Sequence, residues 1–242
     1  MRRSPWRRMV TSARELLFPC AQGLRWLAGR IDPWTNLSCA QEGEDRVLAR
    51  FIGDRRNGYF VDVGAFDPVR FSNTWMLYRQ GWRGINIEPS PEGARRLRRL
   101  RPGDTTLNVG VARTAGKMEY HTFNDPALNT FDAVLAASRD DGRTYRIVGR
   151  STIPVERLDT LLDRHVPAGT AIDLLTVDVE GLVLEVLESN DWKRFRPEYV
   201  MAEALGFELE QAADAPLPAF MASVGYRLVA KTMNTLFFRR SE

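Results

Sequence analysis

The stretch Tyr59-Phe60-Val61-Asp62-Val63-Gly64-Ala65-Phe66-Asp67-Pro68 decides the fold. Residues 58–63 are mostly apolar and are followed by Gly64, which is the pattern of a buried strand that leads into a tight turn. In open α/β folds such a turn lies at the carboxyl edge of the sheet, where small ligands bind. It holds one glycine, whereas the dinucleotide motif G-x-G-x-x-G needs three to seat a pyrophosphate. We therefore predict a ligand-binding strand end that does not hold a nicotinamide cofactor.

Outward from this stretch, apolar strand-like runs alternate with helical patterns. Such alternation predicts a parallel sheet covered on both faces. The chain ends in two apolar runs separated by three residues, which predicts an antiparallel hairpin. We predict an α/β, Rossmann-like class I methyltransferase fold, with a mostly parallel seven-stranded sheet and a C-terminal antiparallel hairpin. The expected strands are 84–87, 106–111, 174–177, 199–202, 226–231 and 235–239, and the expected helices are 44–52, 75–79, 92–100 and 182–188.

The remaining segments suggest two further parts. Residues 118–153 lie outside the alternation, and we expect an insertion over the ligand crevice because long ordered segments in compact domains are more often functional than idle. Residues 1–37 are rich in Arg and Trp and are interrupted by prolines. We predict an N-terminal appendage over 1–37 and one catalytic domain over 38–242.

Charge and composition narrow the class of protein. Of 242 residues, 44% are hydrophobic and 27% charged, as in a folded globular chain, so overall disorder is excluded. The net charge is +3, yet seven arginines against two acids give residues 1–34 a charge of +5, which leaves −2 for the rest. Two cysteines and no apolar run of about 20 residues predict a cytoplasmic protein.

The basic appendage has two interpretations. Basic and aromatic residues together suit an anionic membrane surface, so the segment is a candidate contact to the inner membrane surface or to a partner protein. Alternatively it is a helix packed on its own domain or a partly disordered tail, because Pro19 and Gly23 break the helical period. No nucleic-acid partner is expected of the slightly acidic body.

Two acids end neighbouring predicted strands. Asp62 and Glu88 lie 26 residues apart, and a carboxylate at the second strand end can accept hydrogen bonds from ribose hydroxyls. Together they indicate a nucleoside cofactor without pyrophosphate, and S-adenosylmethionine is of that kind. We expect Asp62 near its amino-acid end, directly or through water, and Glu88 at its ribose. Capping or turn roles are the alternative for both acids. Further candidate cofactor contacts are Gly64, Ala65, Phe66, Asn73, Asn108 and Asp178.

Several ordered blocks stand out between about residues 38 and 240. They are Ser-Cys-Ala-Gln-Glu-Gly-Glu-Asp at 38–45, Val61 to Pro68, Arg-Phe-Ser-Asn-Thr at 70–74, Gly-Trp-Arg-Gly-Ile-Asn-Ile-Glu at 81–88, Phe123 to Phe131, Asp-Val-Glu-Gly at 178–181, Ser-Asn-Asp-Trp at 189–192 and Ala-Lys-Thr at 230–232. Together these blocks resemble the FkbM family of S-adenosylmethionine-dependent methyltransferases. The resemblance implies the class I methyltransferase fold, S-adenosylmethionine as methyl donor, and O-methylation, commonly of a sugar hydroxyl in a glycan or natural product.

Asp178 and Glu180 follow the strand predicted at 174–177, beside the expected methyl group. Methyl transfer to a hydroxyl requires alignment of the reacting atoms and removal of the hydroxyl proton. The two carboxylates can act as base, orient the hydroxyl or hold a divalent cation, and the sequence leaves metal binding undecided. Alternatively, Glu180 binds backbone amides in its turn while Asp178 lines the cofactor site. His121 is a further candidate base, although a lone histidine is more often structural.

Three polar residues in the predicted insertion suit sugar recognition. Asn124, Asn129 and Thr130 offer amide and hydroxyl groups, and their alternative role is to stabilise loop turns. The function expected from the sequence is methylation of a sugar hydroxyl. The rival functions are a non-catalytic glycan-binding or scaffolding module on the same fold, and a nucleic-acid methyltransferase.

Overall fold

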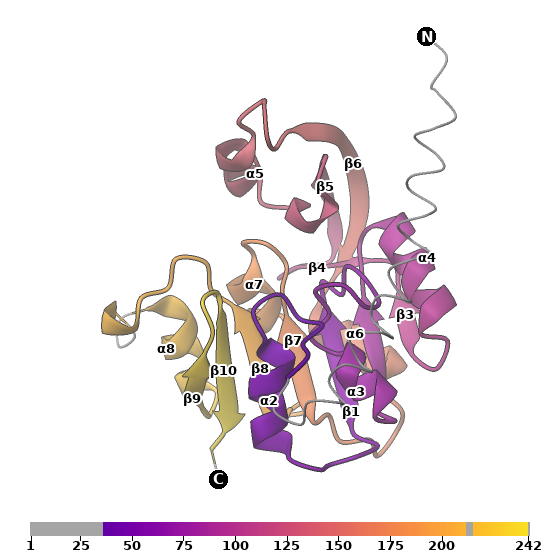
Figure 1. Ribbon diagram of the computed structural model, residues 1–242, viewed down its shortest axis with the longest axis vertical. Helices are drawn as coiled ribbons and strands as arrows, with labels where there is room; N and C mark the ends of the chain where they lie inside the picture. Colours follow the sequence, from indigo (N-terminus) through magenta and orange to yellow (C-terminus); the bar gives the residue numbers. More distant parts are fainter. Residues whose placement is uncertain (1–35, 212–214, 242) are drawn as a thin grey trace. The chain divides into compact units, whose positions relative to one another are not determined.

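A computed structural model describes residues 36–211 and 215–241, and residues 39–242 form one compact unit (Figure 1). The predicted appendage, residues 1–37, lies almost wholly outside the described residues, so its membrane or partner contact stays a prediction. Within the described residues, none of the helices has the length and apolar character that crossing a membrane requires.

The main sheet has seven strands in the order β3-β2-β1-β7-β8-β10-β9. Strands β3, β2, β1, β7 and β8 are parallel neighbours, while β10 runs antiparallel to both β8 and β9. This is the strand order of the class I methyltransferase fold, and both the fold and the C-terminal hairpin are confirmed. The strands are β1 Tyr59–Val63, β2 Arg83–Ile87, β3 Thr105–Leu107, β7 Leu174–Val177, β8 Tyr199–Glu203, β9 Tyr226–Lys231 and β10 Thr235–Arg240.

Helices cover both faces of this sheet, and β1 shows how the sequence assigns the faces. Side chains of a strand alternate between faces, so Phe60 packs into one core cluster and Val61 and Val63 into the other. Asp62 therefore shares the face of Phe60. The helices are α2 Glu44–Ile52 and α3 Trp75–Arg79, which pack with Phe60, and α4 Pro91–Leu100, α6 Leu158–His165, α7 Val183–Glu188 and α8 Pro216–Ser223, with a short turn η2 at Leu209–Gln211.

The segment predicted as an insertion forms a second, three-stranded sheet in the order β4-β6-β5. Figure 1 shows it beyond the carboxyl ends of the main strands. Its elements are β4 Gly110–Val111, β5 Gly116–Phe123, η1 Pro126–Leu128, α5 Ala133–Arg139 and β6 Ile147–Glu156. The single strand predicted at 106–111 was wrong, because β3 pairs with β2 whereas β4 leaves the main sheet to pair with β6.

Candidate active site

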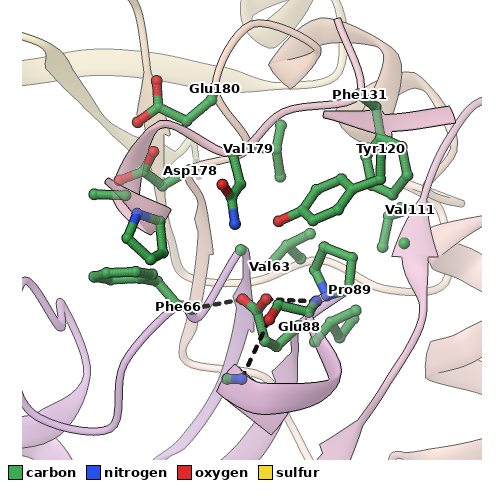
Figure 2. A pocket seen from close by; sticks show the side chains of 18 of the residues that line it. Val63, Phe66, Glu88, Pro89, Val111, Tyr120, Phe131, Asp178, Val179 and Glu180 are labelled. Carbon is green, nitrogen blue, oxygen red and sulfur yellow. Dashed lines mark hydrogen bonds between the residues drawn. The ribbon is translucent and has the colours of Figure 1, made fainter. Parts of the chain in front are cut away.

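A cavity lies at the carboxyl ends of β1, β2 and β7. The chain runs from β1 toward β2 and β3, and later returns to β7 on the other side of β1, so this is the topological switch point where open α/β sheets bind ligands. In Figure 2, Asp178 and Glu180 lie across the cavity from Glu88, and the ring of Tyr120 enters from a third side. The cavity thus has a wall built by the main sheet and a wall to which the insertion contributes.

Gly64 has a structural reason to be glycine. Its φ is +83°, and a Cβ added there would lie 1.7 Å from the backbone oxygen of Asp178. The amides of Gly64 and Ala65 both donate to the Ile87 carbonyl, at 2.9 and 3.2 Å. The amides of these two predicted cofactor contacts therefore join the ends of β1 and β2. Gly64 still lines the cavity, whereas Ala65 is buried and does not.

Glu88 lines the cavity with both of its carboxylate oxygens held. One accepts the Phe66 amide at 2.8 Å and the other accepts the Ser90 amide at 2.7 Å. Burial raises the pKa of Glu88 to about 7, and these two hydrogen bonds oppose the rise. A carboxylate oxygen has a second lone pair, so each can still accept a hydroxyl hydrogen. The arrangement fits a ribose with two neighbouring hydroxyls.

Asn108 stabilises the Glu88 loop from outside. Its side-chain amide donates to the carbonyls of Glu88 and Pro89, at 2.9 and 2.8 Å. The side chain is exposed and does not line the cavity, so the predicted cofactor contact is corrected to a supporting role.

Asp62 and Asn73 lie beneath the cavity and not on its lining. Asp62 accepts a hydrogen bond from the Thr74 hydroxyl at 2.6 Å, and Asn73 donates to the Thr176 hydroxyl at 3.3 Å. Both residues are buried. Burial raises the pKa of Asp62. Any contact of these two side chains with a cofactor needs a water or a small movement of the floor.

Three carboxylates meet at the ends of β7 and β8. One oxygen each of Asp178, Glu180 and Glu203 lies within 4.8 Å of the others. Burial raises the pKa of Asp178 to about 8 and that of Glu203 to about 10, and the neighbouring carboxylates add to both shifts. Glu203 also accepts the Glu180 amide at 3.0 Å. The sequence prediction missed Glu203, although an acid ending a buried strand was the signal that identified Glu88.

Arg139 of α5 is the cation beside this cluster. Its guanidinium forms an ion pair with Glu180 at 2.5 Å. Burial still raises the pKa of Glu180, while Arg139 opposes that shift. Carboxylate oxygens in this number suit a hard divalent cation, with Asp178, Glu180 and Glu203 as the ligands, but protons and Arg139 balance the same charges. The donor set therefore fits either arrangement.

Thr130 holds the Glu180 turn in place. Its hydroxyl donates to the Glu180 carbonyl at 2.6 Å and accepts the Asp132 amide at 2.9 Å. Asp132 in turn caps α5, which carries Arg139. Glu180 needs this support because its φ of +53° is unfavourable for a residue with a side chain. Thr130 is buried and is not on the lining, so its predicted role in sugar binding is corrected.

Strand alternation separates the other candidates in the insertion. Tyr120 and Thr122 of β5 line the cavity, whereas His121 between them does not. His121 is buried and neither ring nitrogen has a hydrogen bond, a placement that argues against the predicted base. Asn124 is exposed and uses its amide to bond the backbone of Thr144 and Arg146, so it too is corrected to a loop role.

Asn129 is the predicted sugar-binding residue that reaches the cavity. Its side-chain oxygen accepts the Phe123 amide at 2.8 Å, and Asn129 lines the cavity together with Tyr120. Tyr120 was not predicted. Its ring packs against Phe131 with centroids 4.7 Å apart, which fixes the hydroxyl within the cavity. Only its place in the alternation of β5 could have indicated it.

Comparison with known proteins agrees with this architecture. A family profile described as the methyltransferase FkbM domain matches residues 62–228. No curated protein matches the chain.

Several solved structures are similar to the chain, including the following three. One is a TehB-like SAM-dependent methyltransferase from Corynebacterium glutamicum, at 11% identity and a TM-score of 0.39, covering 91% of this chain and 97% of that one. Another is a putative RNA methyltransferase from Pyrococcus horikoshii, at 10% identity and a TM-score of 0.42, covering 83% of this chain and 84% of that one. The third is the C-terminal domain of a precorrin-6Y C5,15-methyltransferase from Rhodobacter capsulatus, at 13% identity and a TM-score of 0.40, covering 82% of this chain and 88% of that one.

Proposed function

The chain belongs to the FkbM family of methyltransferases, and from this premise we propose that it methylates a hydroxyl of a sugar in a glycan or a glycosylated natural product. Methylation that depends on S-adenosylmethionine follows from the family. The observation that supports O-methylation is Asp178, a carboxylate on the cavity lining whose pKa burial raises to about 8. Proton removal from a hydroxyl needs a base with a pKa near the working pH.

The charge of the cavity fits S-adenosylmethionine, which carries a sulfonium and an ammonium. Among the described lining residues, four acids face a single arginine, Arg96, and that arginine pairs with Asp67 at 3.2 Å. The acids are Glu88, Glu92, Asp178 and Glu180. When bound, the cofactor would supply a methyl carbon for the hydroxyl oxygen to attack, with the C–S bond breaking and its electron pair returning to sulfur.

The three clustered carboxylates take different roles. Arg139 pairs with Glu180, and the Glu180 amide donates to Glu203. Asp178 lines the cavity and has no ion-pair partner among the described residues. Asp178 is therefore the base: its carboxylate takes the hydroxyl proton as the oxygen bonds to the methyl carbon. Glu203 and Arg139 keep the Glu180 turn next to it.

The insertion supplies groups suited to a sugar. Tyr120, Thr122 and Asn129 bring hydroxyl and amide groups to the cavity lining. Such groups donate and accept hydrogen bonds without charge, which suits neutral sugar hydroxyls. This supports a sugar acceptor over a phosphate-rich one, for which several arginines or lysines would be expected on the lining.

The test is incubation with labelled S-adenosylmethionine and candidate cell-surface glycans, with and without a chelator. We expect label in a glycan fraction, stable to base as a methyl ether is. Loss of activity with the chelator and its return with Mg²⁺ would assign the carboxylates to a metal. Label found in RNA, or a base-labile methyl ester, would overturn the sugar proposal, and absence of cofactor binding by the folded protein would overturn methyl transfer itself.

A further inference from the structure

A buried arginine lies below the cavity, on the face of the sheet that α2 and α3 cover. Arg101 is fully buried and donates to Asp104 at 2.7 Å and to the Thr74 hydroxyl at 2.9 Å. Its guanidinium also lies over the rings of Phe60 and Tyr78, with its carbon 5.1 and 5.2 Å from their centroids. A charge in the core is costly unless it is paired, so this one requires an explanation.

The direction of the hydrogen bonds is fixed by chemistry. Arginine can only donate, so the oxygen of Thr74 accepts from Arg101. A threonine hydroxyl has one hydrogen, and that hydrogen goes to Asp62 over a distance of 2.6 Å. Arg101 thus orients the hydroxyl that holds one oxygen of Asp62. Because Thr74 is fully buried, no water competes for its hydroxyl.

Asp104 has hydrogen-bond donors besides Arg101. It also accepts the Gly84 amide and the side-chain amide of Asn86, both at 3.1 Å. With Asp62 ionised, the group of Arg101, Asp104 and Asp62 carries one net negative charge in the core. A buried group of this kind is stabilised by one further cation at Asp62.

Asp62 lies directly beneath the cavity, where the cofactor's ammonium could supply that cation through a water or after a small movement of the residues beneath the cavity. Asp62 lies on β1, two residues before Gly64. Its negative charge contributes to the raised pKa values of Glu88 and Asp178, which line the cavity. The ammonium of the amino-acid end would bring the net charge of the group to zero.

We propose that Arg101 is a positioning residue for the cofactor: through Thr74 it holds Asp62 in the orientation that binds the amino-acid end. This inference rests on the proposed function, in which S-adenosylmethionine occupies the cavity. Arg101 does not touch the cofactor. It belongs to the core, and its effect appears only in the part of the ligand that Asp62 recognises.

Two ligands separate this role from a general structural one. S-adenosylhomocysteine carries the amino-acid end, whereas 5′-methylthioadenosine has the same nucleoside and lacks it. Binding of both is measured by calorimetry on the full chain and on its variants, after circular dichroism has shown each to be folded. Ligands that differ only at this end report on Asp62 and not on the ribose contact at Glu88.

The decisive variant is Thr74→Val, which keeps the shape of the side chain and removes the hydroxyl. We expect the Kd of S-adenosylhomocysteine to rise about tenfold or more, the usual loss for a hydrogen bond to a charged group, while that of 5′-methylthioadenosine changes by less than about twofold. Thr74→Ser keeps the hydroxyl and should restore most of the affinity.

Arg101→Lys tests the arginine itself. A lysine keeps the positive charge but lacks the planar guanidinium that donates to Asp104 and Thr74 at the same time. The same selective loss of affinity is therefore expected. Arg99→Lys, on the exposed side of α4, is the matched control and should change neither affinity.

Equal weakening of both ligands in Thr74→Val, or unchanged binding of S-adenosylhomocysteine, would overturn the positioning role and leave the proposed function standing. If the unaltered chain binds neither ligand, the proposed function itself fails. If Arg101→Lys does not fold, Thr74→Val decides the question, because the relay to Asp62 runs through that hydroxyl.

Discussion

The two walls of the cavity are built differently. On the wall formed by β1 and β2, the Glu88 carboxylate is held by the backbone amides of Ser90 and Phe66, which are 2 and 22 residues away. On the opposite wall, the Glu180 turn is held by Thr130 and Arg139, which are 50 and 41 residues away and belong to the insertion. The first wall follows from a short motif, whereas the second exists only when the small sheet is in place.

Glu88 on the first wall and Asp178 on the second both line the cavity with a raised pKa, and their surroundings give them different roles. Glu88 accepts two hydrogen bonds that favour its ionised form, so it serves as a fixed acceptor for a ligand's hydroxyls. Asp178 is surrounded by other carboxylates, which favour its protonated form. Burial acts on both acids, and the neighbours of each decide whether it binds a hydroxyl or takes up a proton.

The largest expected effect comes from Asp178→Asn. An amide cannot accept the hydroxyl proton, so methyl transfer should fall by about 10²- to 10⁴-fold, while the affinity for S-adenosylhomocysteine stays within about threefold. Labelled methyl incorporation and calorimetry measure the two quantities.

Asp163→Asn is the control, since Asp163 is exposed on α6 and pairs with Arg194. A variant at Asp178 that retained more than about a tenth of the activity would show that the base lies elsewhere.

Gly64→Ala should cause the next largest loss. The added Cβ meets the Asp178 carbonyl and adopts a φ of +83°, so the free energy of unfolding should fall by at least about 3 kcal/mol. Gly142→Ala also adopts a positive φ, of +66°, but meets nothing within 4 Å, so it should cost only about 1–2 kcal/mol. Urea denaturation measures the free energy of unfolding of both variants. Equal losses would mean that the close contact between Gly64 and the Asp178 carbonyl adds no cost of its own.

The sequence predicted the first wall because each of its parts is local. The strand ending at Gly64 and the acid at Glu88 both follow from patterns within a few residues, whereas the helix cap at Ser90 is a finding of the structure. Six of the seven strands of the main sheet were predicted for the same reason, since their alternation with helices and the C-terminal hairpin are visible in the chain, whereas the strand predicted at 106–111 joined β3 to β4 of the second sheet.

The second wall was predicted less well because pairing within the insertion decides it. The pairing of β5 with β6 sets which of Tyr120 and His121 faces the cavity, and a shift of one residue would exchange them. Nothing local shows that Thr130 reaches the Glu180 carbonyl or that Arg139 pairs with its carboxylate. Of the three insertion residues predicted for sugar binding, Asn129 lies on the cavity lining, whereas Asn124 and Thr130 do not.

The raised pKa values predict that the protein without cofactor is less stable at alkaline than at mildly acidic pH. The Glu88 pKa is about 7 in the folded chain and near 4.5 when unfolded, so between these values the folded state holds a proton that the unfolded state has released. The free energy of unfolding therefore falls as pH rises through this window, by roughly 3 kcal/mol for this group. Thermal melts from pH 5.5 to 8.5 measure the slope.

Glu88→Gln should flatten the part of this slope below pH 7, and Glu210→Gln, at an exposed position, should leave it unchanged. Because the pKa of Asp178 is about 8, its ionisation extends the fall in the free energy of unfolding toward pH 8. A melting temperature that rises from pH 5.5 to 8.5 would contradict the assignment of buried acids to both walls.

Thr130→Val tests the second wall alone. Without the hydroxyl, the Glu180 carbonyl and the Asp132 amide lose their partner, which should cost about 1–2 kcal/mol of stability and lower turnover about three- to tenfold. Binding of S-adenosylhomocysteine should not change, because Glu88 is untouched. Thr152→Val, exposed on β6, is the control, and a loss of cofactor affinity in Thr130→Val would mean that the two walls are not independent.

Asn108→Ala tests the first wall and should have the smallest effect. Its amide holds the carbonyls of Glu88 and Pro89 from the exposed side, so its loss should loosen the loop and raise the Kd of S-adenosylhomocysteine about two- to fivefold, with kcat unchanged. Asn124→Ala is a matched control: that amide also fastens backbone groups, at Thr144 and Arg146, but away from the cavity. If Asn124→Ala weakened cofactor binding as much as Asn108→Ala, the affinity would depend on the general rigidity of the domain and not on the wall that carries Glu88.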